Sequence, residues 1–277
     1  MTLQTLSEWL RCPKCLLDLE ATPPLSLRCK TGHSYDVNKR GYLNALRAGS
    51  GLIGDSAAML DARDRVLESG AYAPISDALL SLLPSAPPRR VHDAGCGTGH
   101  YLEAALEAAA PDARGLAQDI SPSAVSRAVR RSQAIDGLIA DTWAPLPLRS
   151  GSADIVLSIF APRNLPELHR ILTPVSGRLL AVVPRPEHFR EFRDAPGMLA
   201  VPEEKAERLI ESAGPLFALD ARDTAMAKTP VTPELAASLI DMGPSAHHRS
   251  AESESSWRSP ATVTISVDVL RFRPREV

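Results

Sequence analysis

The sequence predicts an α/β protein in which a doubly wound, mostly parallel sheet follows a small metal-binding module at the N-terminus. Two observations predict this fold class. From residue 90 onward, short apolar segments alternate with segments of helical periodicity, which is the pattern of βαβ units. Before residue 40, cysteine and histidine residues occur in two close pairs, which is the spacing of a metal site. We therefore expect three consecutive parts, over residues 1–48, 49–88 and 89–277.

The first part carries Cys12, Cys15, Cys29 and His33, spaced Cys-x2-Cys and Cys-x3-His. Two close pairs on opposite sides of a short loop suit tetrahedral zinc, and four protein ligands leave no open position, so one structural zinc is expected. The alternative is a disulfide pair with an incidental histidine. The residues before Cys12 do not have the pattern of a secretory segment, which favours zinc and a cytoplasmic location.

A helical connector is expected over residues 49–88. Apolar side chains recur at helical spacing from Ala57 to Leu83 and predict two helices that are interrupted near Gly70. The proline-rich segment 84–88 ends the second helix.

The third part begins the alternation of strands and helices that predicts the parallel sheet. Strands are expected over 91–94, 114–120, 137–141, 153–160 and 177–183, and helices over 101–109, 122–132 and 165–172. The pattern is weaker beyond residue 200, where we expect helices near 203–213 and 233–241 and strands near 216–220 and 262–272.

A glycine-rich turn follows the first of these strands. It consists of Asp93, Gly95, Gly97, Thr98 and Gly99, with Ala94 and Cys96 between them. Glycines let the backbone approach a ligand closely, and the N-terminus of the next helix offers free N–H groups. The dinucleotide pattern requires a further glycine at position 100, which is histidine. An acid directly before the glycines is typical instead of proteins that bind S-adenosylmethionine. A purely structural glycine turn is the alternative.

Two further acids are in register with this turn. Asp119 ends the second strand and can accept hydrogen bonds from both ribose hydroxyls, and Asp141 ends the third, where an adenine edge would lie. Ligands of open α/β sheets bind outside the carboxyl ends of the strands. The proline-bounded turns 160–164 and 184–188 follow the fourth and fifth strands and suit a pocket for a planar group.

Composition narrows the function classes. Hydrophobic residues make up 44% of 277 residues, and no apolar run reaches the length of a membrane span. A formal net charge of -2 argues against uniform nucleic-acid binding, but residues 1–50 hold seven basic side chains against four acidic ones. The basic side chains are Arg11, Lys14, Arg28, Lys30, Lys39, Arg40 and Arg47. A solvated face and a phosphate-binding surface both explain this modest excess.

Taken together, the metal module and the glycine turn resemble the bacterial 23S rRNA (guanine-N1)-methyltransferases of the RlmA type over essentially the whole chain. The matching motifs are Cys12-Pro-x-Cys15, Cys29-x3-His33, Lys39-x-Gly41-Tyr42-x-Asn44, Gly54-Asp55-Ser56-Ala57-x-Met59, Gly70-x-Tyr72-x-Pro74, Asp93-x-Gly95-Cys96-Gly97-x-Gly99, Ala161-Pro162 and Pro184-x-Pro186-x-His188. Gly-Asp-Ser-Ala and Pro-x-Pro-x-His are not general methyltransferase motifs, so the resemblance indicates a family as well as a fold.

The resemblance implies a class I S-adenosylmethionine-dependent methyltransferase with a Rossmann-like, seven-stranded sheet. It implies that Cys12, Cys15, Cys29 and His33 hold zinc in a module that recognises 23S rRNA. It also implies that Tyr72, Gly97, Thr98 and His188 contact the cofactor and that the protein forms a homodimer.

Two departures bear on the branch of the family. Phe160 stands where some relatives carry tyrosine, and the segment 242–248 resembles the branch associated with resistance to tylosin-type macrolides. That branch implies a guanine in a hairpin loop of domain II of 23S rRNA, near the nascent-peptide exit tunnel. Guanine N1 lies on the Watson–Crick edge, so the base must be unpaired or flipped. Asp55 is the candidate for the base that removes the N1 proton.

Two other functions are compatible with the same motifs. One is a small-molecule methyltransferase of natural-product biosynthesis, in which zinc only stabilises the chain. The other is a zinc-containing RNA-binding protein whose cofactor domain no longer reacts. The intact Asp93, glycines and Asp119 argue against the second.

Overall fold

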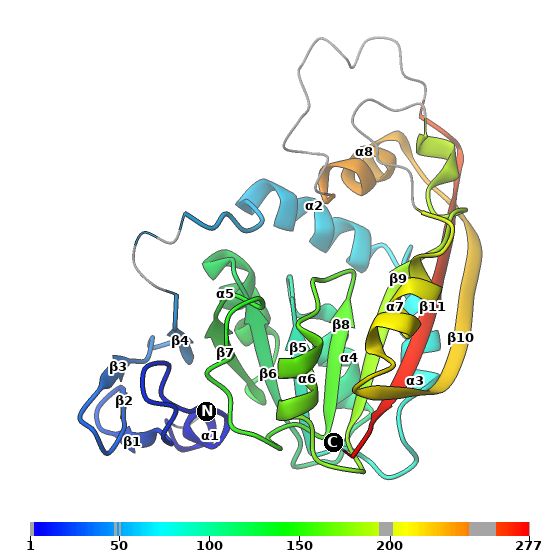
Figure 1. Ribbon diagram of the computed structural model, residues 1–277. Helices are drawn as coiled ribbons and strands as arrows, with labels where there is room; N and C mark the ends of the chain where they lie inside the picture. The colour runs from blue at the N-terminus through cyan, green and yellow to red at the C-terminus, as the bar shows by residue number, and fades with distance from the viewer. Residues whose placement is uncertain (1–2, 47–48, 50, 194–201, 244–258, 277) are drawn as a thin grey trace.

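A computed structural model describes residues 3–46, 49, 51–193, 202–243 and 259–276. Within these residues, β4, β5, β6, β7, β8, β9, β10 and β11 form one sheet in the order β10-β11-β9-β8-β5-β6-β7-β4 (Figure 1). The strands β9, β8, β5, β6, β7 and β4 run parallel, while β11 and β10 are antiparallel to their neighbours. The predicted doubly wound, mostly parallel sheet is confirmed.

The sheet strands are β4 (Tyr42–Asn44), β5 (Arg90–Ala94), β6 (Arg114–Asp119), β7 (Ile135–Ile139), β8 (Ile155–Ile159), β9 (Arg178–Pro184), β10 (Phe217–Pro230) and β11 (Thr262–Pro274). A separate antiparallel sheet holds β1 (Glu20–Thr22), β2 (Ser26–Arg28) and β3 (Ser34–Asp36). The helices are α1 (Leu3–Trp9), α2 (Ala57–Glu68), α3 (Ala73–Ser81), α4 (His100–Glu107), α5 (Pro122–Arg131), α6 (Leu165–Ile171), α7 (Lys205–Ala213) and α8 (Pro233–Asp241), with a 3₁₀ turn η1 (Arg190–Phe192).

Local sequence explains where several helices begin. Ser56, Ser121, Asn164 and Thr232 each accept a hydrogen bond from a backbone N–H in the first turn of α2, α5, α6 and α8. The last three of these helices also carry proline in their first turn, where no intrahelical N–H is lost. The sequence therefore marks these starts well, and the two connector helices are interrupted near Gly70 as predicted.

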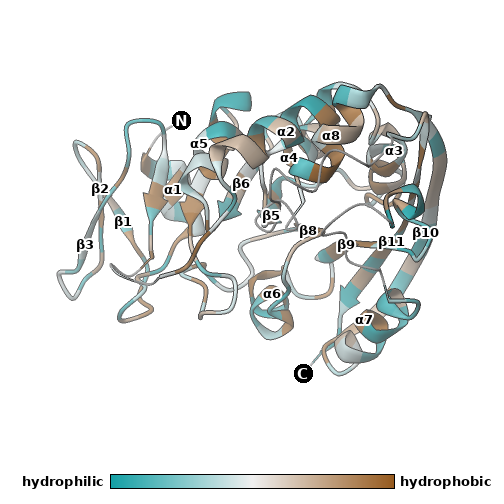
Figure 2. Ribbon diagram, turned by 90° about the horizontal axis from the view of Figure 1, so that it is seen from above, coloured by the Kyte–Doolittle hydropathy of each residue, from teal (hydrophilic) through white to brown (hydrophobic). Residues whose placement is uncertain are grey.

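Two apolar layers cover the two faces of the sheet. One cluster joins α2, α3, α4, α5 and α8 to the sheet, and the other joins α1, α6 and α7 to its opposite face. The helices α2 and α8 lie across the carboxyl ends of the parallel strands (Figures 1 and 2). Arg63 and Arg65 of α2 donate hydrogen bonds to Met242 O and Ser238 Oγ, which ties α2 to α8.

The sheet has one strand more than the seven expected, because the N-terminal module contributes β4. Tyr42–Asn44 pairs in parallel with Gly137–Ile139 of β7, at the edge of the sheet. The module also packs against the sheet through Leu6, Leu10 and Leu43, which are fully buried. The expected boundary at residue 48 stays a prediction, but the module and the large sheet share one core.

Backbone contacts fix the docking of the module further. The N–H of Arg11 donates to Pro147 O, and that of Arg149 donates to Trp9 O. The Arg149 guanidinium donates to Leu10 O and Leu19 O and forms an ion pair with Asp18. These contacts hold the module in one orientation, at the end of the sheet opposite β10 (Figure 1).

Most element boundaries lie within two residues of those predicted, but β10 is much longer. We expected a strand near 216–220, whereas β10 runs over 217–230 and pairs with β11 along its length. Residues 244–248 of the segment used for the branch assignment lie outside the described residues. No helix among the described residues is long and apolar enough to span a membrane.

Candidate cofactor site and metal centre

The four predicted metal ligands come together in the module. Their ligand atoms all lie within 4.8 Å of one another. Cys15 Sγ lies 3.6 Å from Cys29 Sγ, and His33 Nδ1 lies 3.5 Å from the sulfurs of Cys12 and Cys29. Tetrahedral zinc bonded at about 2.3 Å to sulfur and about 2.0 Å to nitrogen requires edges of about 3.8 Å and about 3.5 Å. The donor set fits zinc, and the sulfurs are too far apart for a disulfide.

Neighbouring hydroxyl groups surround these ligands. Thr31 Oγ1 lies 3.0 Å from Cys29 Sγ and 3.2 Å from Cys15 Sγ, and Tyr35 Oη lies 3.2 Å from Cys12 Sγ. Burial raises the pKa of the Cys29 thiol, but hydrogen bonds from Thr31, Cys15 and backbone amides outweigh it and hold that pKa at about 6. The surroundings therefore favour the thiolate that a metal requires.

The glycine turn has the backbone conformation that glycine alone adopts freely. Gly95, Gly97 and Gly99 have φ of +88°, +51° and +82°. A Cβ on Gly95 would lie 2.5 Å from Ala161 Cβ, and one on Gly99 would lie 2.7 Å from Ala128 Cβ. Side chains at these positions would push the turn away from β8 and α5, so the glycines hold the turn close to both.

Asp93 is the last but one residue of β5, just before this turn, and is 2% exposed. Its Oδ1 has no hydrogen-bond partner among the described residues. Burial, together with the charge of Asp119, raises the pKa of Asp93 to about 8. A buried carboxyl group without a partner suits a cation, which would favour its ionised form.

Asp119 lies at the end of β6, beside the turn. It accepts hydrogen bonds from the N–H of Gly97 at 3.0 Å and of Ser121 at 2.9 Å. Burial raises the pKa of Asp119, and the two backbone amides oppose this. Asp141, just past β7, accepts a hydrogen bond from Trp143 N–H at 2.9 Å. The structure therefore brings Asp119 to the turn and leaves Asp141 in an Asx turn at the same edge of the sheet.

Asp55 lies over the same loop. Its carboxylate pairs with Arg63 at 2.5 Å, and its carbonyl accepts a hydrogen bond from Ser121 Oγ. A Cβ on Gly97 would lie 3.0 Å from Arg63 Nη1, so the ion pair covers the glycine turn. To take a proton from a substrate, Asp55 would first have to leave Arg63. Its predicted role as a base stays a prediction.

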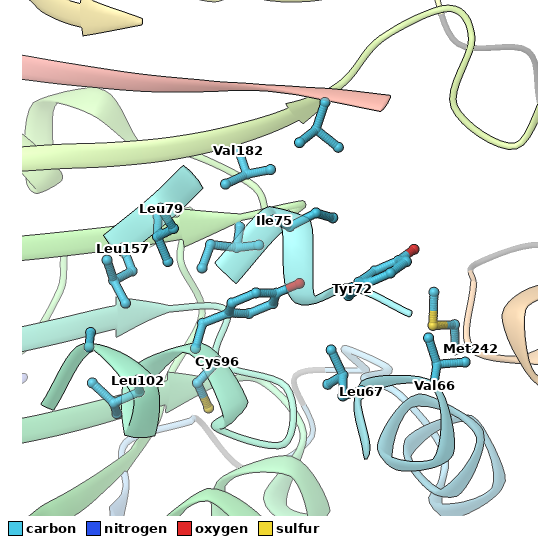
Figure 3. Close-up of a cluster of buried hydrophobic side chains, with 14 of the residues drawn as sticks. Val66, Leu67, Tyr72, Ile75, Leu79, Cys96, Leu102, Leu157, Val182 and Met242 are labelled. Carbon is cyan, nitrogen blue, oxygen red and sulfur yellow. The ribbon is translucent and has the colours of Figure 1, made fainter. Parts of the chain in front are cut away.

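An aromatic cluster, which we define as Tyr72, Phe160, His188 and Phe189, forms beside the turn. Tyr72 lies 6.2 Å, centroid to centroid, from both Phe160 and His188, and His188 stacks on Phe189 at 4.1 Å. Tyr72 is 4% exposed and belongs to the same buried apolar cluster as Ile75, Cys96 and Met242 (Figure 3). Phe160 and Phe189 have positive φ values of 53° and 56°, a strained conformation that clusters at functional sites.

His188 has a defined protonation state in this cluster. Its Nδ1 accepts a hydrogen bond from Ser266 N–H at 3.1 Å, so a neutral ring carries its proton on Nε2. Burial lowers the pKa of His188 to about 4, with a smaller effect from the charge of Lys205. The ring is therefore neutral near pH 7 and presents an N–H donor.

Sequence analysis did not identify Arg63, Phe189 or the neighbouring Arg163 as site residues. Arg63 reaches Gly97, and Phe189 reaches Tyr72, only in the fold, because each pair is far apart in the sequence. Arg163 lies in the proline-bounded turn after β8 that the sequence did mark as part of a pocket. The structure places Tyr72, Thr98 and His188 with the glycine turn at one edge of the sheet.

The fold and this edge define a Rossmann-like methyltransferase with an added metal module. A methyltransferase domain family matches residues 91–179. A solved complex of the Haloferax volcanii Trm112 methyltransferase activator and a methyltransferase contains a chain that superposes with a TM-score of 0.55 at 21% identity, covering 81% of this chain and 100% of that one. At this identity the superposition supports the fold alone.

Two curated relatives specify the family. The 23S rRNA (guanine(748)-N1)-methyltransferase of Streptomyces fradiae is 40% identical over 87% of this chain and 86% of its own. A candidate 23S rRNA (guanine-N1)-methyltransferase of Micromonospora griseorubida is 38% identical over 96% of this chain and 97% of its own. The chain belongs to the 23S rRNA (guanine-N1)-methyltransferase family, which confirms the resemblance found in the sequence.

Proposed function

We propose that this protein transfers a methyl group from S-adenosylmethionine to N1 of a guanine in 23S rRNA. The observation that carries this proposal is the identity of 38–40% to relatives of that activity over nearly the whole chain, zinc module included. A small-molecule methyltransferase would have no comparable use for a basic N-terminal module fixed to the sheet.

The glycine turn would hold the cofactor. Bound S-adenosylmethionine supplies a methyl group on a cationic sulfonium. Asp93, whose Oδ1 lacks a partner, would meet its ammonium group, and Asp119 and Asp141 would bind the ribose and adenine. Gly95, Gly97, Thr98 and Gly99 would line the approach, as Tyr72 and His188 would from the aromatic cluster. These assignments follow the order of the strands at the carboxyl edge.

The aromatic cluster would accept the flipped guanine. Flat side chains stack on a base whatever its sequence context, and Phe160, at the end of β8, is 41% exposed. The Nε2–H of neutral His188 would donate to an acceptor, whereas it cannot accept the guanine N1 proton while Ser266 N–H occupies Nδ1. Asp55 therefore remains the proposed base, provided that it exchanges Arg63 for the substrate proton.

The zinc module would bind RNA beside the reacting base. Lys39 and Arg40 line an open groove of about 760 Å³ with Pro24, Leu25 and Asp36. Because β4 fixes the module to β7, this groove has a set position relative to the carboxyl edge. Zinc would stabilise the groove through Cys12, Cys15, Cys29 and His33 rather than take part in the reaction.

Further features of the proposal rest on the family resemblance. The target would be the hairpin loop in domain II of 23S rRNA, and its methylation would reduce binding of tylosin-type macrolides. The protein would act as a homodimer in the cytoplasm, where the rRNA is made. The loop is a suitable target because its bases can be splayed from their stack at low cost.

Primer extension on 23S rRNA tests the reaction. A methyl group on N1 blocks the pairing edge, so reverse transcriptase should stop one nucleotide before the modified guanine in rRNA from expressing cells. Cells that express Asp93→Asn, which should bind the cofactor far more weakly, are the matched control and should show a weaker stop or none. Full read-through, with labelled methyl groups entering a small molecule instead, would contradict the proposal.

A further inference from the structure

Arg163 follows β8 and folds back over the ends of two strands. Its Nη2 donates to the carbonyl oxygens of Ser158 at 3.2 Å and Val182 at 2.9 Å. Its Nε is buried without a hydrogen-bond partner, and Arg163 forms no ion pair with any described residue. Burial lowers the pKa of Arg163 to about 10, so the side chain stays charged at neutral pH.

A charge that is largely buried and has no opposite charge beside it is unfavourable unless other groups compensate. Two carbonyl dipoles compensate only in part, because they occupy one nitrogen of the guanidinium and leave Nε unsatisfied. A leucine or methionine would fill the same space without this penalty. The position therefore suits a ligand that brings an anion to Arg163.

Lys205, the first residue of α7, adds a second positive charge. Burial lowers the pKa of Lys205, and the charge of Arg163 lowers it further. The charge of Lys205 acts in turn on His188, so the lysine lies within electrostatic range of both Arg163 and the aromatic cluster. In Figure 1, α6 and α7 lie on the same side of β8 and β9, and Arg163 comes shortly before α6 in the sequence.

A hollow next to Lys205 borders the segment that precedes the aromatic cluster residue His188. It measures about 260 Å³ and is lined by Lys205 and the segment 184–187, which directly precedes His188. Its two arginines are both paired with acids. Arg185 lies 3.4 Å from Asp268 and 3.7 Å from Glu187, and Arg222 lies 3.1 Å from Asp268 and 2.7 Å from Glu207.

The acids of the hollow do not neutralise its lysine. Glu187 and Glu203 line the same hollow, but neither forms an ion pair with Lys205. Neither Arg163 nor Lys205 therefore has a paired acid among the described residues.

We propose that Arg163 and Lys205 form an anion site that holds a phosphodiester of the RNA strand beside the flipped guanine, an inference that rests on the proposed function. The site lies after β8 and β9, on the α6 and α7 side of the rim. The glycine turn, where the cofactor would bind, follows β5, and its nearby cation is Arg63. Phosphate contacts fix the register of a nucleic acid, and a flipped nucleotide needs its backbone held in the rotated position.

The test compares three variants in the full-length protein with a transcript of the 23S rRNA domain II hairpin. Arg163→Gln and Lys205→Gln each remove one charge from the site. Arg208→Gln is the matched control, because Arg208 lies on α7 and is exposed like Lys205 but is paired with Glu204. RNA affinity is measured against salt concentration, cofactor affinity by calorimetry, and thermal stability by unfolding.

Arg163→Gln should weaken RNA binding about tenfold and reduce the slope of log affinity against log salt by about 0.7, the value for one single-strand phosphate. Lys205→Gln should do the same to a smaller extent, and Arg208→Gln should change neither quantity. Cofactor affinity should stay constant. The melting temperature of Arg163→Gln should stay constant or rise, because an unpaired buried charge is removed.

The following outcomes would contradict the proposed anion site. A lower melting temperature of Arg163→Gln with an unchanged salt slope would make the residue structural. Loss of cofactor affinity instead of RNA affinity would assign the anion to the cofactor carboxylate. If Arg163→Gln does not fold, an unchanged slope in the exposed Lys205→Gln variant still refutes the site. A wild-type protein that neither binds nor methylates rRNA refutes the proposed function itself. An active wild type, with unchanged RNA affinity and salt slope in both Arg163→Gln and Lys205→Gln, refutes only the anion site.

Discussion

The metal centre and the carboxyl edge of the sheet differ in how far their polar groups are satisfied by the chain itself. Around the metal centre, Thr31 and Tyr35 contact the sulfur ligands, and residues 3–46 contribute no buried side-chain atom that lacks a partner among the described residues. At the carboxyl edge, Asp93 Oδ1, Thr98 Oγ1 and Arg163 Nε all lack one.

The difference fits the role proposed for each region. A structural metal site is complete once four ligands meet around the ion, so its surroundings can be satisfied within the chain. A binding edge must exchange ligands, and its donors and acceptors stay without protein partners until a ligand arrives. Unsatisfied buried groups are therefore a better guide to the reacting edge than burial or charge alone.

Of the changes that test this comparison, removal of one metal ligand should have the largest effect. Cys29→Ser should lose the bound zinc, because structural zinc sites in small modules contribute about 10 kcal/mol or more of folding free energy. Elemental analysis should fall from one zinc per chain to none. RNA binding should be lost to a far greater extent than cofactor binding.

Cys96→Ser is the matched control, because Cys96 is a buried free cysteine outside the cluster. This variant should keep its zinc. A Cys29→Ser protein whose module stays ordered and active without metal would contradict the prediction that the module requires zinc.

Replacement of Asp93 should have the next largest effect. Asp93→Asn should weaken S-adenosylmethionine binding on the order of 100-fold, since a charge-assisted hydrogen bond is worth about 3 kcal/mol. The pKa of about 8 means that the free protein holds a proton there at pH 7, which cofactor binding would release. Cofactor affinity should thus rise with pH up to about 8 in the wild type.

Calorimetry at several pH values checks this, and Asp93→Asn should show no such dependence. The raised pKa of Asp93 also has a consequence for stability, because the unfolded chain loses this proton at lower pH. The contribution of the protonated Asp93 carboxyl to the free energy of unfolding should be lost as pH rises from about 4 to about 8. Over this range Asp93→Asn should lose less stability than the wild type. A pH-independent wild-type affinity would show that Asp93 does not meet the cofactor.

Asp119→Ala should have a smaller effect, because backbone amides already satisfy part of this carboxylate. We expect cofactor affinity to fall by about 2 kcal/mol through lost hydrogen bonds to ribose. The fold should survive, since Asp119 ends β6 rather than filling the core. Titration calorimetry and unfolding measure the two quantities separately, and unchanged affinity would mean that the glycine turn binds another ligand.

The smallest effect should come from the basic groove of the module. Replacing Lys39 and Arg40 together by Ala should weaken RNA binding and flatten its dependence on salt, with cofactor affinity constant. Arg40 Nη1 also donates to Ser126 Oγ of α5, so Arg40→Ala alone should lower stability slightly, whereas Lys39→Ala should not. An unaltered salt slope in the double variant would place the RNA surface elsewhere, and the helix with Arg127, Arg130 and Arg131 is the next candidate.

The sequence predicted that the four metal-ligand candidates come together and that a glycine turn follows β5, because both depend on local spacing. Cys12 and Cys15, like Gly95 and Gly97, are close neighbours whose geometry their own segment determines. The aromatic cluster could not be predicted in the same way, because Tyr72 and Phe189 meet only after β9 and α3 have packed.

The length of β10 and the role of β4 were also beyond local patterns. Along β10 most side chains are exposed or only partly buried, as expected of an edge strand, so its hydrophobic alternation is weak. The three residues of β4 carry too short a pattern to indicate a partner more than ninety positions away.

The pairing of β4 with β7 also sets the distance between the groove at Lys39 and Arg40 and the carboxyl edge of the sheet. Leu43 faces the core on one side, and Tyr42 sits against Gly137, where a Cβ would lie 2.6 Å from Tyr42 Cβ. A slip of one residue would exchange these faces, so the module can shift along β7 only in steps of two residues, about 6.6 Å. The distance from this groove to the carboxyl edge can therefore change only in increments of that size. Relatives that modify different guanines can be compared by measuring that distance, before any base contact is considered.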